Sequence, residues 1–356
     1  MEEILELGYF FYGKQENYKI LTKLFGNLAY IVAALVGIPA NIIVIKRIVQ
    51  SKDFQKSASY LIILNLAIAD FLFLSGTPLL LYNSFLDSWN LGLFLCKAFL
   101  SSNAANHFAS SIFMGLLAFD RYLAICCKNN FLHKYRTYYV GVIFCIIAWL
   151  IVFFAILPLF HFGNIVHFID NINDTTKLKK NVCMLVWSPT NDGEFLLSDS
   201  LDFFENLQFS RRIFTSYTFA LGYIIPLVAV WLFYAIIIYT VRKHGSSTII
   251  SNNHIKKRTF KITRLGILIG VIYTFCWLPF WFVQWSIEEG ASWTLKHSCL
   301  MAISYFAYVL GYFNSVINPF TFISFSNKHK HFAYKDSQKK RLKDKKYGIL
   351  LKNHQL

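Results

Sequence analysis

The chain has 356 residues, of which 56% are hydrophobic and only 15% charged, and its formal net charge is +16. This composition excludes an ordinary soluble domain, in which about a quarter of the residues are charged. Seven stretches are uncharged or nearly so, and each is long enough to cross a bilayer as a helix. They cover residues 24–45, 57–86, 98–119, 137–160, 213–241, 265–287 and 298–327. None alternates in polarity as a barrel strand would, so we predict an all-α membrane protein, a seven-transmembrane helix bundle.

The connections between these spans differ in charge. Those after spans one, three and five, together with the tail, hold most of the 35 Lys and Arg residues, whereas the opposite side holds most of the 19 Asp and Glu residues. Positive connections mark the cytoplasmic side of a membrane. We therefore expect an N-terminus outside and a cytoplasmic C-terminus. The basic charge then reflects orientation and contact with the lipid bilayer, and no nucleic acid is expected as a partner.

Four parts follow one another along the chain. We expect an extracellular N-terminus at 1–23 and the seven-transmembrane domain at 24–325. A short amphipathic helix on the cytoplasmic surface is expected at 326–334, and a basic cytoplasmic tail at 335–356. Residues 1–23 lack the basic start and apolar core of a cleaved signal peptide, so span one is expected to act as an uncleaved signal.

The long connection between spans four and five carries three features. Cys183 lies in it, and Cys96 lies at the outer start of span three, so a disulfide between them fits the oxidising side of a membrane; two free cysteines are the alternative. Asn173 begins a glycosylation sequon. The acidic stretch 191–205 is either a solvated loop or an electrostatic collector for a basic ligand.

Charged residues are rare within the spans. Asp70 is a carboxylate in the middle of span two, where a charge without partners would cost several kcal/mol. Asp120-Arg121-Tyr122 directly follows span three. Arg121 is permanently charged, and a permanent cation at a membrane border indicates a functional role.

Ordered motifs in every span resemble those of the rhodopsin-like G-protein-coupled receptors, over about residues 25–332. The matching residues are Asn41 in span one, Asn65-Leu66-Ala67-Ile68-Ala69-Asp70 in span two, Trp89 before Cys96, Asp120-Arg121-Tyr122 after span three, Trp149 in span four, Pro226 and Tyr234 in span five, Cys276-Trp277-Leu278-Pro279 in span six, and Asn318-Pro319-Phe320-Thr321-Phe322 in span seven. Residues 106–113, the loop from Cys183 to Trp187, and Lys256-Lys257-Arg258 look like the somatostatin, allatostatin-C and opioid group of neuropeptide receptors.

The resemblance implies a plasma-membrane receptor that binds an extracellular neuropeptide and activates a heterotrimeric G protein of the Gi/o type, with arrestin as a candidate further partner. A small non-amine metabolite is the alternative ligand. A membrane transporter is an alternative from another class, but it would show inverted repeats and several buried charges, which the sequence lacks. No enzyme is expected, because no nucleophile with a base and no set of metal ligands is visible.

A switch for the G protein is also implied. Arg121 is expected to pair with Asp120 at rest and to face the G protein once span six swings outward. Thr259 stands where many relatives have an acid, and Phe322 stands where the family has Tyr, so Phe322 cannot join a water bridge to Tyr234. The residues expected at this switch are Asp120, Arg121, Tyr122, Tyr234, Thr259, Asn318, Pro319 and Phe322.

The family binds an allosteric sodium ion around the acid of span two, and this chain has an oxygen-bearing side chain at each corresponding position. Oxygen ligands suit a hard cation. A water-filled hydrogen-bond network without a fixed ion is the alternative; no other cofactor is implied. The expected sodium ligands are Asp70, Asn106, Ser110, Asn314, Ser315 and Asn318.

The resemblance places a ligand pocket between spans three, five, six and seven. Amine receptors need an acid at the position of Asn103, and a neutral side chain there argues against an amine ligand. Opsins need a lysine at the position of Tyr312 to bind retinal, so the chain is not expected to be an opsin. The remaining aromatic side chains suit a peptide with aromatic residues, or they only pack between helices. The candidate pocket residues are Asn103, His107, Trp277, Phe280, Trp281, Gln284, Tyr308 and Tyr312.

Overall fold

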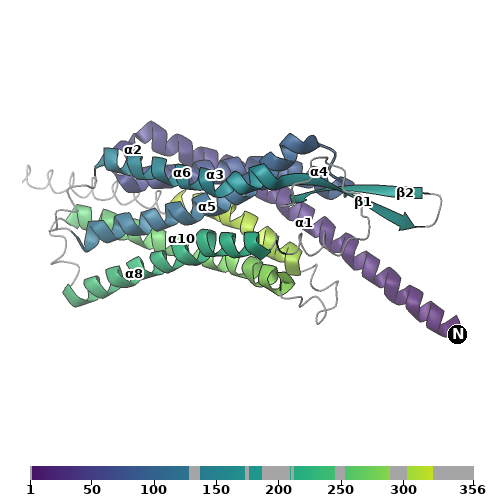
Figure 1. Cartoon of the computed structure of the whole chain (residues 1–356). Coiled ribbons are helices and arrows are strands. Elements are labelled where there is room, and N and C mark those ends of the chain that lie inside the picture. Colours follow the sequence, from purple (N-terminus) through teal and green to yellow (C-terminus); the bar gives the residue numbers. More distant parts are fainter. Residues whose placement is uncertain are drawn as a thin grey trace, which may run out of the picture.

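The protein is a bundle of long helices that lie side by side, with one β-hairpin at an end (Figure 1). The computed structural model describes residues 2–127, 137–172, 176–186, 209, 212–244, 253–288 and 303–323. Within these ranges, the side chains are described except at 2–19, 56, 167–180, 244, 253–258 and 287. The helices are α1 Glu2–Ser51, α2 Asp53–Lys56, α3 Ala58–Ser75, α4 Thr77–Leu86, α5 Gly92–Ile125, α6 Tyr138–Phe162, a helix over 212–219, the π-helix η2 Ala220–Ile224, α8 Ile225–His244, α10 Asn253–Glu288 and a helix over 303–323.

All seven predicted spans are helical where they are described. Six helical segments are long and apolar enough to cross a membrane. The seventh, the helix over 303–323, contains no charged residue, but three tyrosines and the amides of Asn314 and Asn318 make it less hydrophobic than the others. The predicted helix bundle is therefore confirmed, and the least apolar span is the one that carries expected site residues.

A β-hairpin that the sequence analysis did not predict fills the described part of the connection after α6. Strands β1 Gly163–Ile172 and β2 Thr176–Leu185 pair antiparallel, from Gly163 opposite Leu185 to Ile172 opposite Thr176. The predicted disulfide between Cys96 and Cys183 is confirmed and joins β2 to α5. Figure 1 shows the hairpin and the N-terminal part of α1 projecting from the same end of the bundle, which we call the hairpin end. The opposite end is the Arg121 end.

Two predicted spans are interrupted, each near a proline. Span two divides into α3 and α4 at Gly76, and Pro78 lies in the first turn of α4, where its missing N–H costs no helical hydrogen bond. Span five contains η2 just before Pro226. Pro226 cannot donate to the Gly222 carbonyl four residues earlier, and Tyr273 Oη of α10 donates to that carbonyl at 3.0 Å.

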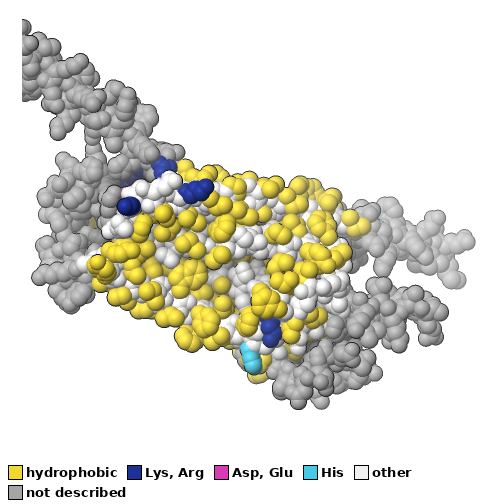
Figure 2. Space-filling view, turned by 90° about the horizontal axis from the view of Figure 1, so that it is seen from above, with side chains coloured by type: hydrophobic (Ala, Val, Ile, Leu, Met, Phe, Trp, Pro, Cys, Tyr) yellow, Lys and Arg dark blue, Asp and Glu magenta, His cyan; other side chains and the backbone are white. Residues whose placement is uncertain are grey.

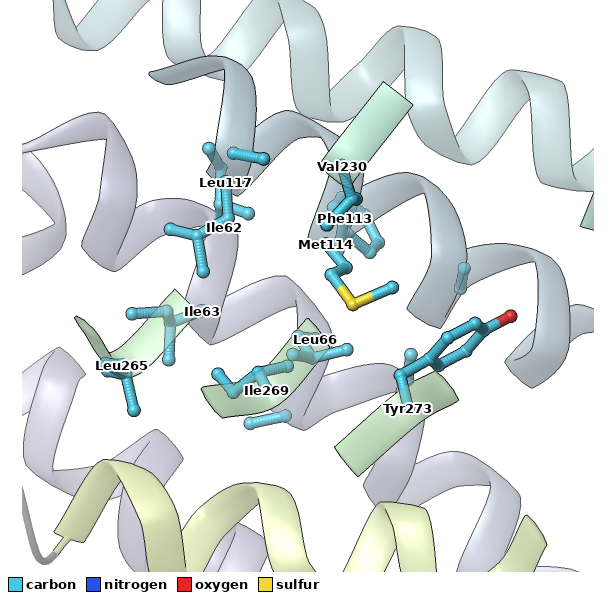
Figure 3. Close-up of a cluster of buried hydrophobic side chains, with 14 of the residues drawn as sticks. Ile62, Ile63, Leu66, Phe113, Met114, Leu117, Val230, Leu265, Ile269 and Tyr273 are labelled. Carbon is cyan, nitrogen blue, oxygen red and sulfur yellow. The ribbon is translucent and has the colours of Figure 1, made fainter. Parts of the chain in front are cut away.

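The central helix is α5, which contacts α3, α6, α8 and α10. Figure 3 shows the core formed by these helices. Its labelled side chains are Ile62, Ile63 and Leu66 of α3, Phe113, Met114 and Leu117 of α5, Val230 of α8, and Leu265, Ile269 and Tyr273 of α10.

The outward surface of the bundle is apolar. Leu35, Phe94 and Phe282 are each at least 70% exposed. On the face in Figure 2, hydrophobic side chains cover most of the described surface, and Lys and Arg side chains lie toward its ends. Such a surface is unfavourable in water and matches a hydrocarbon environment.

Candidate functional site

Arg121 lies inside the bundle and its charge is compensated locally. Its side chain is only 2% exposed. The Nε atom donates to Asp120 Oδ2 at 3.1 Å, and the Nη2 atom donates to both Asp120 Oδ2 and Ser59 Oγ. Ser59, from α3, also donates its hydroxyl hydrogen to Asp120 Oδ2. Asp120 and Arg121 therefore form the expected ion pair, and Ser59 ties it to a neighbouring helix.

Two other expected switch residues face different neighbours. The Tyr122 ring packs against Phe233 of α8, with ring centroids 5.4 Å apart. The Thr259 carbonyl accepts a hydrogen bond from Thr263 Oγ1 at 3.0 Å within α10. These contacts join Tyr122 to span five and tie Thr259 to the next turn of its own helix.

Tyr234 and Phe322 are buried on separate sides of the core. A Cβ placed on Gly266 of α10 would lie only 2.0 Å from the Tyr234 hydroxyl, so Tyr234 occupies the space that this glycine leaves. The hydroxyl itself is buried and has no hydrogen-bond partner within the described part of the chain. Phe322 instead meets the ring of Tyr60 edge to face, with centroids 6.2 Å apart. Phe322 has no hydroxyl with which to bridge to Tyr234, and its described ring contact is with Tyr60 of α3.

Asp70 is fully buried at the centre of a polar network between α3, α5 and the helix over 303–323. Ser315 Oγ donates to Asp70 Oδ1 at 2.7 Å, and Asn318 Nδ2 donates to Asp70 Oδ2 at 2.9 Å. Asn106 Nδ2 donates to Ser315 Oγ at 3.2 Å, and Ser110 Oγ donates to Asn106 Oδ1 at 3.4 Å. Five of the six expected sodium ligands are thus hydrogen-bonded to one another.

Asn314 is the sixth expected ligand, and neither of its side-chain polar atoms has a hydrogen-bond partner among the described residues, although both are buried. The Asn318 Oδ1 atom is in the same situation. Buried amide oxygens normally have partners, so these two can accept a further group such as a cation or a water molecule. The residues present therefore fit an oxygen-coordinated cation beside Asp70.

Three of the expected pocket residues form an aromatic cluster toward the hairpin end. His107 of α5 has its ring centroid 4.3 Å from that of Trp277 and 5.4 Å from that of Trp281. Gly222 of η2 lies against the imidazole, because a Cβ there would come within 2.7 Å of His107 Cδ2. Both imidazole nitrogens are buried without a partner in the described structure.

Four of the other five pocket residues form two hydrogen-bonded pairs. Tyr312 Oη donates to Asn103 Oδ1 at 3.4 Å, while the Tyr312 ring packs against Tyr30 and Phe73. Gln284 Nε2 donates to Tyr308 Oη at 3.0 Å. Phe280 packs against both Tyr308 and Trp281 and so connects the second pair to the aromatic cluster. Tyr312 thus extends the site toward α1 and α3.

Sequence reasoning missed Ser59, Tyr273 and Trp285. Ser59 gave no signal, because a serine in an apolar span usually bonds to its own helix. Tyr273 could have been found from Pro226, whose missing N–H leaves the Gly222 carbonyl in need of a donor. Trp285 repeats the four-residue spacing of Trp277 and Trp281, so the spacing of the tryptophans was a signal for it.

Several expectations lie outside the described residues. These are the sequon at Asn173, the acidic stretch 191–205, the amphipathic helix at 326–334 and the tail at 335–356. Pro319, by contrast, is described and is buried next to Asn318.

Comparison with known proteins agrees with this arrangement. Residues 40–322 match the family described as 7 transmembrane receptor (rhodopsin family). The chain is 27% identical to somatostatin receptor type 2 of Mus musculus over 302 residues, covering 85% of this chain and 73% of that protein. It is 28% identical to somatostatin receptor type 1 of Rattus norvegicus over 297 residues (82% and 66% covered), and 29% identical to the type-2 angiotensin II receptor of Meriones unguiculatus over 308 residues (84% and 76% covered). The chain therefore belongs to the rhodopsin family of seven-transmembrane receptors, the class A G-protein-coupled receptors, and is not an enzyme.

Proposed function

We propose that this receptor lies in the plasma membrane with its hairpin end outside, binds a peptide at that end, and activates a heterotrimeric G protein through Arg121. The observation that carries the proposal is the buried group of Arg121, Asp120 and Ser59 at the end opposite the aromatic cluster. Arg121 is held between α3 and α5 in this conformation, so exposing it requires a rearrangement of the helices. A ligand that favours the rearranged bundle would produce that exposure.

Three features support a peptide as the ligand. The relatives are receptors whose names carry the peptides somatostatin and angiotensin II. Asn103, which bonds to Tyr312, offers no charge for an amine ligand. The aromatic cluster around His107, Trp277 and Trp281 offers apolar area of the kind that binds aromatic side chains.

The G protein is proposed to be of the Gi/o type, with arrestin as a further partner at the Arg121 end. The connection between α8 and α10 is short and begins after Arg242 and Lys243, and α10 begins with Lys256, Lys257 and Arg258 in its first turns. This pattern is similar to that of Gi/o-coupled relatives. The positive charge also supports a cytoplasmic location of this end and of the C-terminus.

A sodium ion is proposed to bind beside Asp70, held by the oxygens of Asp70, Asn106, Ser110, Asn314, Ser315 and Asn318. When bound, the ion would neutralise Asp70 and link α3, α5 and the helix over 303–323. The unpartnered oxygens of Asn314 and Asn318 support this proposal. By holding three helices together, the residues around the ion would favour the conformation described above.

A nucleotide-exchange assay tests the proposed function. Membranes that contain the receptor and a Gi/o protein would be treated with somatostatin, with angiotensin II and with a library of secreted-peptide sequences. We expect at least one peptide to increase binding of GTPγS, and we expect Arg121→Ala to abolish the increase at equal surface expression. The proposal is contradicted if no peptide in the library acts, or if the Arg121→Ala receptor responds as strongly as the unmodified one.

A further inference from the structure

Three tryptophans form a row along the half of α10 that points toward the hairpin end. Trp277, Trp281 and Trp285 are spaced four residues apart, so they lie on one face of the helix with a rise of about 6 Å between neighbours. We call this row the tryptophan ladder. Its outer two members face span five, because the Phe219 ring lies 5.0 Å from that of Trp281 and 5.5 Å from that of Trp285. Trp277 packs instead against His107 of α5 and Gly311 of the helix over 303–323.

All three indole N–H groups of the tryptophan ladder are buried and have no hydrogen-bond partner among the described residues. This is unusual, because a buried indole normally finds an acceptor. Trp149 shows the ordinary situation in the same bundle, since its Nε1 donates to Asn65 Oδ1 at 2.9 Å. A buried donor without an acceptor has lost its hydration without compensation, so the tryptophan ladder favours any conformation that supplies acceptors.

The neighbours of the ladder define the acceptor's chemistry. The described ring contacts of the ladder are aromatic, and none is a Lys or Arg: His107, Phe219, Tyr223, Tyr273 and Phe280. Glu288, one turn beyond Trp285, is buried and accepts a hydrogen bond from Thr215 Oγ1 at 3.3 Å. Arg212 Nη2 donates to the Glu288 carbonyl at 2.8 Å, so a guanidinium lies beside this carboxylate. The described ring contacts of the ladder include no Lys or Arg that would compensate an anionic ligand group. The chemistry therefore favours neutral carbonyl oxygens over a carboxylate or phosphate.

We infer that the tryptophan ladder binds the main chain of an extended peptide, whose alternate carbonyl oxygens accept hydrogen bonds from successive indoles. In an extended chain, carbonyls on the same side recur every two residues, at about 6.6 Å. This repeat is close to the rise of about 6 Å between successive tryptophans of α10. The inference rests on the proposed function and specifies how its peptide is recognised: by main-chain geometry as well as by side chains.

This mode of binding is linked to movement of the helices. Phe219 covers Trp281 and Trp285 in the present conformation, so a peptide has to part span five from α10 at that ring to reach them. The π-helix η2 begins directly after Phe219, and π-helical turns are rare and occur frequently at functional sites. The hydrogen bonds to the ladder would form only in the parted conformation. A peptide bound in this way therefore has a differential affinity for the two conformations, which is what an agonist requires.

Substitutions that remove only the N–H group test the inference. Trp281→Phe and Trp285→Phe keep an aromatic ring and lose the donor, and the probe is the peptide most active in the GTPγS assay. We expect each change to lower its potency about five- to tenfold, the effect of one lost hydrogen bond. The control is Trp231→Phe, which alters a tryptophan on the outward surface of α8 that is 37% exposed. The control should leave potency unchanged.

A second set of peptides separates a hydrogen bond from a packing effect. In each analogue, one carbonyl oxygen of the probe is replaced by sulfur, a weaker acceptor. We expect one analogue to lose potency on the unmodified receptor but not on the Trp281→Phe receptor. A second analogue, with sulfur two residues further along the peptide, should lose potency on the unmodified receptor but not on the Trp285→Phe receptor. Additive losses for every analogue, or unchanged potency in both variants, would overturn the inference while leaving the proposed function intact. If no peptide activates the receptor, both fail.

Discussion

At the scale of single residues, the buried charges of Arg121 and Asp70 are compensated in different ways. Arg121 has a carboxylate beside it in sequence, and the remaining contact is the hydroxyl of Ser59. Asp70 has no cation among its described hydrogen bonds and relies on Ser315 and Asn318. A buried carboxylate held by neutral donors alone is the more costly arrangement, so it has the stronger need for a cation.

This difference predicts that sodium ions stabilise the receptor through Asp70. At a concentration ten times the dissociation constant, a bound ion adds about 1.4 kcal/mol to the free energy of unfolding. We expect the purified receptor to melt a few degrees higher in sodium chloride than in choline chloride at equal ionic strength. Asp70→Asn should remove this difference.

Asp87→Asn provides the matched control, because Asp87 pairs with Lys23 at the hairpin end, away from the Asp70 network. It should preserve the dependence on sodium. Equal melting temperatures in the two salts for the unmodified receptor would mean that the polar network around Asp70 holds water and not an ion.

At the scale of helices, the contact between Tyr234 and Gly266 joins span five to α10 near the Arg121 end. Gly266 lets the tyrosine approach so closely that a methyl group could not fit between them. The Tyr234 hydroxyl remains without a hydrogen bond in the described structure, so this conformation gains packing but leaves a polar atom unsatisfied. Movement of α10 away from span five would relieve the close contact at Gly266 and would free the Tyr234 hydroxyl to find a hydrogen-bond partner.

We predict that Gly266→Ala raises agonist-free nucleotide exchange. The new methyl group would overlap the Tyr234 hydroxyl, and overpacking of this kind costs about 1–3 kcal/mol in the closed bundle. Such a cost shifts the equilibrium toward the parted helices roughly fivefold or more. GTPγS binding without added peptide measures the shift.

Gly270→Ala, one turn along α10, separates this effect from helix propensity. A Cβ at Gly270 would lie 3.4 Å from Val230 Cγ1, an ordinary contact. Both substitutions improve the helix propensity by about 1 kcal/mol, so only the overlap differs. If both variants, or neither, raised exchange, then the tyrosine contact would not control the position of α10.

The sequence predicted the elements that depend on long patterns and missed those that depend on single contacts. The seven spans were found because about twenty apolar residues in a row have no other stable arrangement in lipid. The β-hairpin was not found, because its strands carry polar residues and are held by particular contacts such as Trp89 N to the Asn181 carbonyl. The division at Gly76 and the π-helix η2 are likewise set by local backbone bonding, which hydropathy does not report.

The candidate site shows the same division. Asp70 and Arg121 stood out because charge within an apolar span is rare. The contact of Phe322 with Tyr60 depends on how the helices pack and is not visible in the order of residues.

At the scale of the whole molecule, the two ends of the bundle perform different tasks. The hairpin end is fastened by the Cys96–Cys183 disulfide and by the Lys23–Asp87 pair, and it carries the tryptophan ladder. The Arg121 end holds the ion pair and the Tyr234–Gly266 contact. The helix α10 is common to both ends, since it carries Trp285 near one and Gly266 near the other. The account therefore requires a movement of α10 near Trp285 to be transmitted along the helix, past Pro279, to Gly266.

The most direct test is the distance across the Arg121 end before and after peptide binding. Spin labels would be attached at Gln50→Cys on α1 and Arg264→Cys on α10, two exposed positions, in a receptor that retains the Cys96–Cys183 disulfide. We predict that the activating peptide produces a second, longer distance and that the population of this distance rises with GTPγS binding. A peptide that stimulates GTPγS binding while the distance stays unchanged would contradict the account.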